Sequence, residues 1–350
     1  MMLKHLLWPF ALIYGLIIKL RNHLFDIGYS RSFRFDVKTI GVGNLSVGGT
    51  GKTPAVEYLI SKFKEKEKVA TLSRGYGRRT KGFLMADYRS TAVDIGDEPL
   101  QFYSKFGQEI TVAVDEERIH GIPEILYHRP ETSLIFLDDI FQHRHVNPHF
   151  LVLLTTYDKP FFDDYILPVG RLRESRFGAK RADVVLVTKS PEQLSEQNKI
   201  HFKKNILKYT KKEVPVFFTT VGYSQPVNEK GLVRSYNKKA VLVTGIANPL
   251  HFKKHLDGIT DIRKHYNYPD HYNFKASDVK KWLDYCNENN LSDIVVSEKD
   301  WMRIKPHTID VNSENVNFII QPISMMFIDK SEEDEFLNLL DFRINGINKG

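Results

Sequence analysis

A glycine-rich stretch near the amino terminus has the residue types and the spacing that bind phosphate. It follows a strand-like segment at residues 37–40 and precedes a helix-like segment at residues 55–60. Glycines let successive backbone N–H groups turn toward an anion, the following helix directs its positive end at the same place, and a lysine reaches the β- and γ-phosphates. The threonine hydroxyl suits Mg²⁺. We therefore predict a nucleotide triphosphate site formed by Ser46, Val47, Gly48, Gly49, Thr50, Gly51, Lys52 and Thr53.

Two pairs of acidic residues stand next to predicted elements, one pair directly after a strand and the other directly before a helix. The apolar run 133–137 ends in Asp138 and Asp139, and in phosphate-loop proteins such an acid holds Mg²⁺ directly or through water. Asp97 and Glu98 precede a helical segment at residues 100–105. Asp97 has two interpretations of equal weight: a helix cap, or a base that takes a proton from a hydroxyl group. His143, taken alone, is typical of a structural histidine.

Cationic loops follow other predicted strands. Arg74 lies in the segment 73–79, directly after a strand at 68–72, and Arg171 and Glu174 lie in a loop at 167–175 framed by glycine and proline. Loops at the carboxyl ends of parallel strands are where such sheets bind ligands, although a solvated surface loop has the same composition. Guanine-specific proteins commonly carry aspartate two residues after the lysine of their base-recognition motif. Here Pro191 stands two residues after Lys189, which favours adenine.

The spacing of the apolar runs predicts the elements that must position these residues. Strand, loop and helix alternate from residue 38 onward, which is the pattern of an α/β fold with a parallel sheet and helices on both of its faces, of the phosphate-loop NTPase type. An irregular region at 222–239 precedes a second strand–loop–helix unit. We therefore predict an amino-terminal helix at 1–28, a phosphate-loop domain at 29–222 and a smaller α/β domain at 223–350.

The segment 6–18 is an uninterrupted apolar run flanked by the cations Lys4, Lys19 and Arg21. A helix needs roughly 20 apolar residues to cross a bilayer, so a run of this length favours lying in or dipping into one leaflet over spanning it. A signal peptide is disfavoured because no small-residue cleavage site follows and the phosphate loop comes soon after. A buried core helix is the remaining interpretation.

Composition narrows the class of protein. The chain has 350 residues, 42% of them hydrophobic and 27% charged, which is enough for two ordinary cores. Its net charge of +7 favours acidic partners such as phosphates or anionic lipid. The single cysteine, Cys286, excludes a disulfide framework and a Cys-rich zinc site. Repeats and RNA-binding signatures are absent from the sequence, so we expect no nucleic acid partner.

Motifs spread along the chain together resemble those of the tetraacyldisaccharide 4'-kinase family, which is membrane-associated and acts in lipid A assembly. The resemblance extends from the amino-terminal apolar segment to about residue 305. The family's phosphate loop is similar to the one here, with Ser46 where the common pattern has glycine; Ile140 departs from the glycine that family members often have. The motifs are GNLSVGGTGKTP (43–54), SRGY (73–76), GDEP (96–99), DDIFQH (138–143), LPVGRLRE (167–174), PDH (269–271) and SEKD (297–300).

The resemblance implies transfer of the γ-phosphate of ATP to the 4'-hydroxyl of a tetraacylated glucosamine disaccharide 1-phosphate, which gives lipid IVA. ATP and Mg²⁺ are the implied cofactors. The implied partners are the lipid substrate and a membrane surface, the cytoplasmic face of the bacterial inner membrane, with no obligate protein partner. Phosphoryl transfer depends mostly on positioning and charge neutralisation, so such an enzyme needs a phosphate cradle, Mg²⁺, cations and a carboxylate near the acceptor.

The resemblance also implies a role for each predicted site residue. Lys52 and the loop amides hold the phosphates, and Asp97 is the base, assisted by His271 when the smaller domain closes over the site. Mg²⁺ binds Thr53 and acids of the site, with the choice among Asp138, Asp139, Glu174 and Glu98 left open. The implied catalytic residues are Asp97, His271, Lys52 and Asp139, the substrate-binding residues are Arg74, Arg118, Arg171 and His143, and the metal-binding residues are Thr53, Glu174, Asp139 and Glu98.

Two other functions fit parts of the sequence. A nucleotide-switch protein would bind a partner instead of phosphorylating a metabolite, but Pro191 and the lack of a Cys/His metal cluster in the sequence count against it. In a soluble small-molecule kinase, the apolar segment 6–18 would only form part of the hydrophobic core. Such a kinase would stay soluble without detergent and lose nothing on deletion of residues 1–20.

Overall fold

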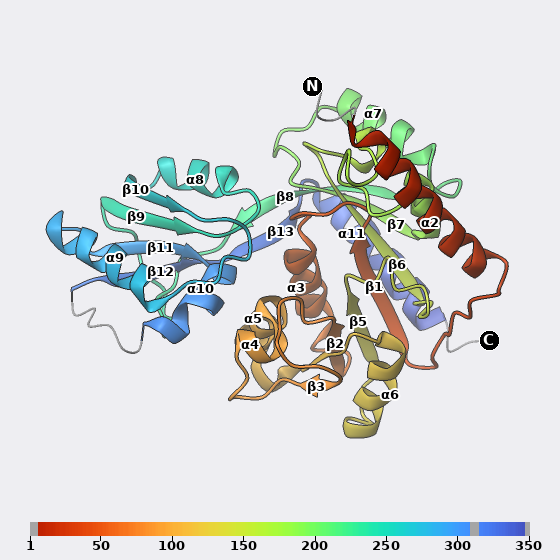
Figure 1. The fold of residues 1–350 in the computed structure, drawn as a ribbon, viewed down its shortest axis with the longest axis horizontal. Coiled ribbons are helices and arrows are strands. Elements are labelled where there is room, and N and C mark those ends of the chain that lie inside the picture. The colour runs from red at the N-terminus through yellow and green to blue at the C-terminus, as the bar shows by residue number, and fades with distance from the viewer. Residues whose placement is uncertain (1–5, 309–314, 347–350) are drawn as a thin grey trace.

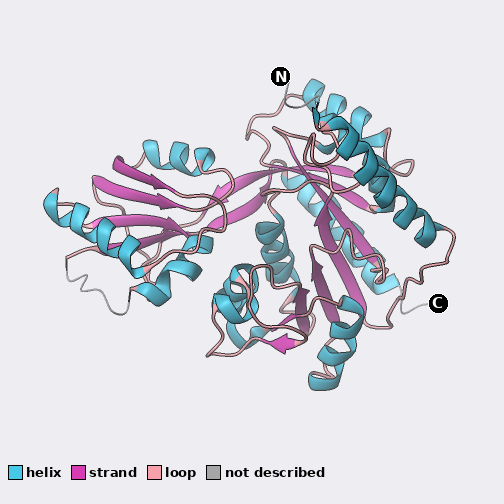
Figure 2. Ribbon diagram, in the orientation of Figure 1, coloured by secondary structure: helices cyan, strands magenta, loops and turns pink. Residues whose placement is uncertain are grey.

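The computed structural model describes residues 6–308 and 315–346, which form two sheets with helices around them (Figures 1 and 2). The larger sheet has the order β13-β8-β7-β6-β1-β5-β2-β4-β3. Its neighbours are parallel, except that β13 is antiparallel to β8 and β3 is antiparallel to β4. Its strands are β1 (Lys38–Asn44), β2 (Val69–Ser73), β3 (Leu84–Met85), β4 (Thr111–Val114), β5 (Leu134–Asp138), β6 (Phe150–Thr156), β7 (Val184–Thr188), β8 (Val216–Tyr223) and β13 (Ile323–Phe327).

Both faces of the larger sheet are covered, because its strands are apolar on both sides. Along β5, Leu134 and Phe136 pack into the core on one face, and Ile135 and Leu137 pack into the core on the other. The predicted α/β class, with a mostly parallel sheet and helices on both faces, is confirmed. One face holds α3 (Lys52–Phe63), α5 (Asp97–Phe106) and α11 (Lys330–Asn345), and the other holds α6 (Arg118–His128) and α7 (Glu196–Leu207), while the short α4 (Ala92–Ile95) precedes α5.

The smaller sheet is parallel and has the order β10-β9-β11-β12. Phe252 and Leu256 of α8 pack on one face of it, and Trp282 of α9 and Trp301 of α10 pack on the other. Its elements are β9 (Lys239–Thr244), α8 (Leu250–Asp257), β10 (Asp261–Asn267), α9 (Ala276–Glu288), β11 (Asp293–Ser297), α10 (Glu298–Ile304) and β12 (Asn317–Gln321).

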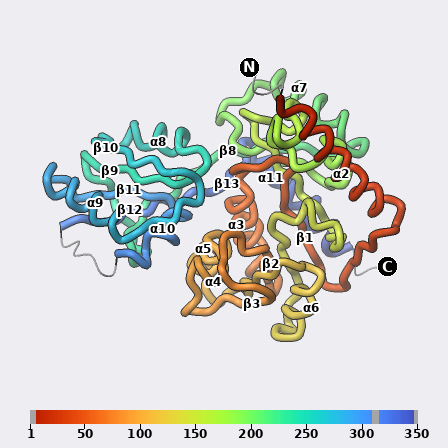
Figure 3. The backbone as a smooth tube through the Cα atoms, in the orientation of Figure 1, coloured from red at the N-terminus to blue at the C-terminus, as the bar shows by residue number. Residues whose placement is uncertain are grey.

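The chain does not end in the smaller unit. We expected all of residues 223–350 there, but β13 returns beside β8 and α11 then packs under the larger sheet, as the blue end of the tube in Figure 3 shows. The reason lies in α11 itself, where Phe336, Leu340 and Ile344 form an apolar stripe at helical spacing that completes the core of the larger sheet. β8 and β13 thus form the connection between the two sheets.

The amino-terminal helix α2 (Trp8–Asp26) lies on the outside of the larger unit (Figure 1). Ala11 and Phe25 are buried, whereas most of its other apolar side chains are exposed. Lys4 lies outside the described residues. Within the described ranges, none of the helices combines the length and the apolar character needed to cross a membrane.

Replacement of Phe336 by alanine tests the role of α11 in the larger core. The side chain is fully buried and packs against Phe217 and Phe327. We expect Phe336→Ala to lower the free energy of unfolding by about 3–5 kcal/mol in urea denaturation. Phe342→Ala on the same helix is the control, because Phe342 is exposed and its loss should change stability by less than about 0.5 kcal/mol. Equal effects would contradict the placement of α11.

Candidate functional site

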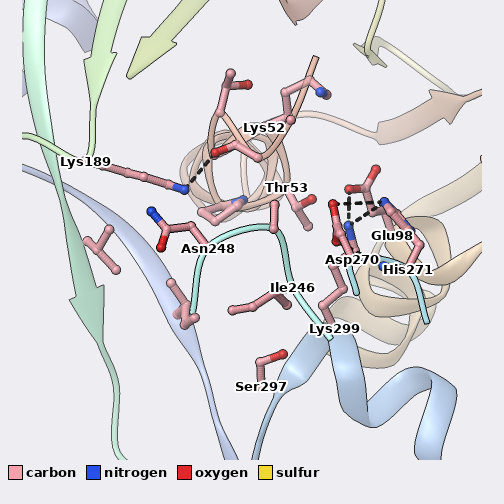
Figure 4. Close-up of a pocket in the computed structure, with 18 of the residues that line it drawn as sticks. Lys52, Thr53, Glu98, Lys189, Ile246, Asn248, Asp270, His271, Ser297 and Lys299 are labelled. Carbon is pink, nitrogen blue, oxygen red and sulfur yellow. Dashed lines mark hydrogen bonds and ion pairs between the residues drawn. The ribbon is translucent and has the colours of Figure 1, made fainter. Parts of the chain in front are cut away.

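The phosphate loop connects β1 to α3 and lines a cavity of about 440 Å³ with all of the residues 46–53. Gly51, directly before α3, has a φ of 83°, a conformation that glycine adopts without strain. The helix begins at Lys52, so its positive end faces the cavity. Lys189, on the loop after β7, donates to the Gly49 carbonyl at 2.7 Å and closes one side of the loop (Figure 4).

Asp138, the last residue of β5, and Asp139, which follows it, lie in opposite environments. Asp138 is buried and its Oδ1 atom has no hydrogen-bond partner among the described residues. Burial, with Glu98 nearby, raises its pKa to about 7. Asp139 instead accepts two hydrogen bonds from Arg173, at 2.8 and 3.0 Å, and lies 3.6 Å from Lys52 Nζ. Although burial opposes the effect, Lys52 and Arg173 hold the pKa of Asp139 far below its usual range.

Asp97 begins α5 and lies against the smaller unit. His271 Nδ1 is 3.2 Å from its Oδ2 atom, Arg303 Nε is 3.7 Å away and Lys299 Nζ is 3.9 Å away. Burial would raise the pKa of Asp97, but His271, Lys299 and Arg303 outweigh it and lower the pKa to about 2. His271 and Lys299 also line the same cavity as Lys52 (Figure 4). Because α5, which Asp97 begins, packs on the same face of the larger sheet as α3, Asp97 lies on the Lys52 side of the sheet.

A second glycine brings the loop after β2 against the start of α5. Gly96 has a φ of 93°, and a Cβ atom there would lie 3.0 Å from the Tyr76 carbonyl oxygen. A side chain at position 96 would be strained by this φ and would crowd the backbone of residues 75 and 76, so glycine suits the close approach of that loop to the start of α5. Tyr76 also packs its ring edge-to-face against His271, with centroids 5.1 Å apart. The position of the Asp97–His271 pair thus depends on backbone contacts as well as on charge.

A second cavity of about 390 Å³ adjoins the first. Tyr76, Glu98, Asp139 and Arg173 line both cavities and mark where they meet. Its other walls come from the loop after β2, the residues after β5 and the inner face of α2. These lining residues are Tyr14, Ile18, Arg21, Asn22, Ser73, Arg74, Gly75, Pro99, Asp138, Gln142, His143 and Glu174.

The predicted substrate residues divide into two groups. Arg74 and His143 line the second cavity, and burial together with Arg118 lowers the pKa of His143 to about 4, so it is a neutral side chain at neutral pH. Arg118 is fully buried and donates to the carbonyls of residues 115 and 138. Arg171 pairs with Asp164. Neither Arg118 nor Arg171 is among the residues that line the two cavities.

The predicted metal residues also separate. Glu98 lines both cavities, and the Thr53 hydroxyl lies at the start of α3 in the larger one. Glu174 is buried, with both oxygens bonded to Arg181 at 2.8 Å, and it accepts further bonds from Gln142 and Asn22. Glu174 is therefore satisfied by protein groups alone, and this geometry favours Asp138 and Glu98 as candidate metal-binding acids.

Sequence reasoning missed several groups that the fold brings to the site. Arg173 lines both cavities; its loop was expected to bind phosphate, but only Arg171, two residues earlier, was named as a substrate-binding residue. Lys299 donates to Glu98 at 3.0 Å, and Arg303 to Asp300 at 2.6 Å and to the Gly245 carbonyl at 3.0 Å. Lys299 lies in the SEKD motif (297–300), and its place in that motif could have identified it as a site residue from the sequence.

Comparisons with known proteins agree with one another. A family model described as tetraacyldisaccharide-1-P 4'-kinase matches residues 3–342. The chain is 43% identical over 344 residues to a tetraacyldisaccharide 4'-kinase of Cytophaga hutchinsonii, covering 98% of this chain and 96% of the relative. It is 41% identical over 337 residues to the protein of that name from Flavobacterium psychrophilum, covering 95% and 94%. A crystal structure of LpxK from Aquifex aeolicus in complex with ATP superposes with a TM-score of 0.74 at 26% identity, covering 98% and 99% of the two chains.

The different environments of Asp138 and Asp139 predict opposite effects on stability. In the nucleotide-free protein with EDTA, we expect Asp138→Asn to raise the free energy of unfolding at pH 8 by on the order of 1–3 kcal/mol, because the wild type then buries an unpaired charge. At pH 5 the gain should shrink, since a folded-state pKa of about 7 keeps Asp138 protonated there.

Asp139→Asn is the matched control and should destabilise the protein at both pH values. Its folded-state pKa is lowered, so its stabilising charge is present above its unfolded pKa of about 3.9 and is lost only in more acidic solution. Urea denaturation of the two variants at pH 5 and pH 8 measures both effects. A pH-independent effect of Asp138→Asn would contradict the burial of its charge.

Proposed function

The chain belongs to the tetraacyldisaccharide-1-P 4'-kinase family, and on that premise we propose how its residues carry out the reaction and where. It is an ATP-dependent kinase that phosphorylates the 4'-hydroxyl of a tetraacyldisaccharide 1-phosphate in lipid A biosynthesis. The observation that carries the proposal is the meeting of the two cavities at Tyr76, Glu98, Asp139 and Arg173, beside the Asp97–His271 contact. One cavity has the phosphate loop, and the other has arginines and the inner face of α2.

The larger cavity is the proposed nucleotide site. Lys52, Lys189 and the phosphate-loop N–H groups supply positive charge in this cavity, and Lys52 lies 3.6 Å from Asp139, where the second cavity begins. Tyr223, Ile246 and Phe252 supply an apolar wall from the other side, which suits a nucleobase. ATP would therefore lie with its base toward the smaller sheet and its γ-phosphate beside Asp139 and Arg173.

The second cavity is the proposed site of the sugar acceptor. Arg74 and Arg21 are the cations that suit the substrate's 1-phosphate, and neutral His143 can donate or accept hydrogen bonds with sugar hydroxyls. Arg118 and Arg171 are not proposed as substrate contacts. Arg118 instead holds the backbone of Asp138 in place, since its Nη2 atom donates a hydrogen bond to the Asp138 carbonyl at 3.1 Å.

The transfer step follows from these positions. The acceptor oxygen bonds to the γ-phosphorus as the bond from that phosphorus to the β,γ-bridging oxygen breaks, and the hydroxyl proton passes to the Asp97–His271 pair. His271 lines the cavity and Asp97 lies behind it, only slightly exposed, so the two act as a unit. Lys52 and Arg173 neutralise charge on the transferring phosphoryl group.

The acids present fit a Mg²⁺ ion. Asp138 has a buried oxygen with no hydrogen-bond partner in the described part of the chain, Glu98 lines both cavities, and the Thr53 hydroxyl lies in the first turn of α3. One or two carboxylates together with substrate phosphates are the usual donors for this ion. We propose that Thr53, Asp138 and Glu98 hold Mg²⁺, with Asp139 fixing Lys52 and Arg173 beside it. When bound, the ion would neutralise phosphate charge.

The exposed face of α2 is the proposed contact with the cytoplasmic face of the inner membrane. Phe10, Ile13, Leu16, Ile17 and Leu20 are all exposed on that face. A four-chain lipid barely leaves the bilayer, so an enzyme that binds its headgroup must lie at the membrane surface. Lys19 and the exposed cations that follow, Arg31 and Arg34, suit anionic headgroups.

Asp97→Asn tests the proposed base. We expect kcat with the lipid disaccharide to fall about 10²–10⁴-fold, since the variant cannot accept the hydroxyl proton, while the affinity for ATP stays near normal. The assay is transfer of labelled γ-phosphate, with nucleotide binding measured separately. Near-normal ATP affinity together with full turnover would rule out the base assignment.

A double substitution on α2 tests the membrane contact. Replacing Ile13 and Ile17 by serine should weaken binding to vesicles that contain anionic lipid at least about tenfold, because each exposed isoleucine would contribute about 1.5–3 kcal/mol on burial. Co-sedimentation measures the binding. Ile200→Ser on α7 is the control, since Ile200 is equally exposed but outside α2. Unchanged binding of the α2 variant would argue against the proposed orientation.

A further inference from the structure

Glu57 is a buried carboxylate that the reaction described above does not use. It lies on α3 at 4% exposure, on the face toward α5. Gln101 Nε2 donates to its Oε1 atom at 2.7 Å, and Lys105 Nζ donates to its Oε2 atom at 2.7 Å. Both oxygens of Glu57 are therefore bonded to α5, the helix that begins with Asp97.

The spacing places these bonds one helical turn behind the reacting groups. With 3.6 residues per turn, Glu57 follows Thr53 by about one turn on α3, and Gln101 follows Asp97 by about one turn on α5. The two helices begin at the cavity and are joined directly behind it. The Glu57–Gln101 bond therefore joins the helix that follows the phosphate loop to the helix that begins with the proposed base.

The same cluster reaches the smaller unit. Lys105 Nζ lies 3.5 Å from Glu298 Oε2, and Glu298 is the first residue of α10. The Ser104 hydroxyl lies 3.4 Å from Met302 Sδ, one turn further along α10. α10 also carries Lys299 and Arg303, which face Asp97. Three helices that begin at the site are thus joined through side chains of α5.

Stability alone does not explain a carboxylate at this position. The neighbours of Glu57 on α3, such as Val56 and Leu59, belong to the apolar core, and a buried ion pair is often no more stable than apolar side chains of similar size. Burial raises the pKa of Glu57 to about 7, an effect that Lys105 opposes, so its ionised form is expensive to keep there. Hydrogen bonds, unlike apolar contacts, fix direction as well as distance.

We propose that Glu57 is a positioning residue, which holds α5 in the register that presents Asp97 to the acceptor hydroxyl beside the phosphate loop. The proposal rests on the proposed role of Asp97 as the base. Glu57 touches neither nucleotide nor acceptor in this arrangement. Its effect is on the geometry of proton removal and not on the affinity of the phosphate loop for ATP.

A pair of substitutions separates positioning from packing. Glu57→Leu keeps a similar volume but removes both hydrogen bonds, so kcat should fall about 10–100-fold, the size of effect expected for a misplacement near 1 Å. KM for ATP should stay within about twofold of the wild type. Glu57→Gln should keep most of kcat, because its carbonyl can accept from Lys105 and its amide can donate to Gln101 Oε1, which has no partner among the described residues.

Glu67→Leu is the matched control. Glu67 follows the far end of α3 and accepts hydrogen bonds from Lys38 and Ser133, so it has similar chemistry away from the site. Its loss should lower stability without changing kcat. If Glu57→Leu does not fold, Gln101→Leu removes the same bond from the other helix, with nucleotide affinity measured directly because Gln101 lines the larger cavity.

The outcomes distinguish this proposal from the assignment of the base. A normal kcat in folded Glu57→Leu, or an equal loss in Glu67→Leu, would overturn the positioning role while leaving a defective Asp97→Asn to support the base. A rise in KM for ATP without loss of kcat would assign Glu57 to the phosphate loop and overturn the proposal. Full turnover in Asp97→Asn would remove the base assignment and the positioning role together.

Discussion

The contact between the start of α5 and the start of α10 is the constraint on which the rest of the site depends. Asp97 and Glu98 lie in the first turn of α5, where their charge is favourable at the positive end of the helix. Lys299 lies in the first turn of α10, where its own helix repels it. The two carboxylates compensate for that repulsion, so the larger and smaller sheets are held together at the point where their charged groups are also needed for chemistry.

Neighbouring acids can serve different purposes because the fold surrounds them differently. Asp139 is at the end of β5 with a φ of 48°, an uncommon conformation for a residue with a side chain, and it is clamped by Arg173. Asp138 lines the second cavity and has Arg118 bonded to its backbone carbonyl instead of its carboxylate. Arg173 therefore forms an ion pair with the carboxylate of Asp139. Arg118 leaves the carboxylate of Asp138 available to the second cavity, because it bonds only to the backbone of that residue.

The sequence was most informative where local pattern determines structure. Glycine spacing and apolar runs predicted a loop between a strand and a helix, a mostly parallel sheet and helices on both of its faces. The structure confirms each of these elements of the fold. The return of α11 to the larger sheet was not predictable from order along the chain, since sheet pairing joins β8 to β13 across the whole smaller unit.

The site shows the same limit at the level of single residues. Arg171 and Arg173 are alike in sequence and lie in one motif, yet Arg171 pairs with Asp164 while Arg173 reaches Asp139 and the Asn44 carbonyl. The direction of each side chain depends on the bridge that joins Leu172 to Ser46, a contact between segments far apart in the chain. α2 follows the same principle, because its inner face brings Tyr14 and Asn22 to the second cavity while its outer face stays apolar and exposed. One helix therefore contributes polar side chains to the second cavity through one face and apolar side chains to the surface through the other.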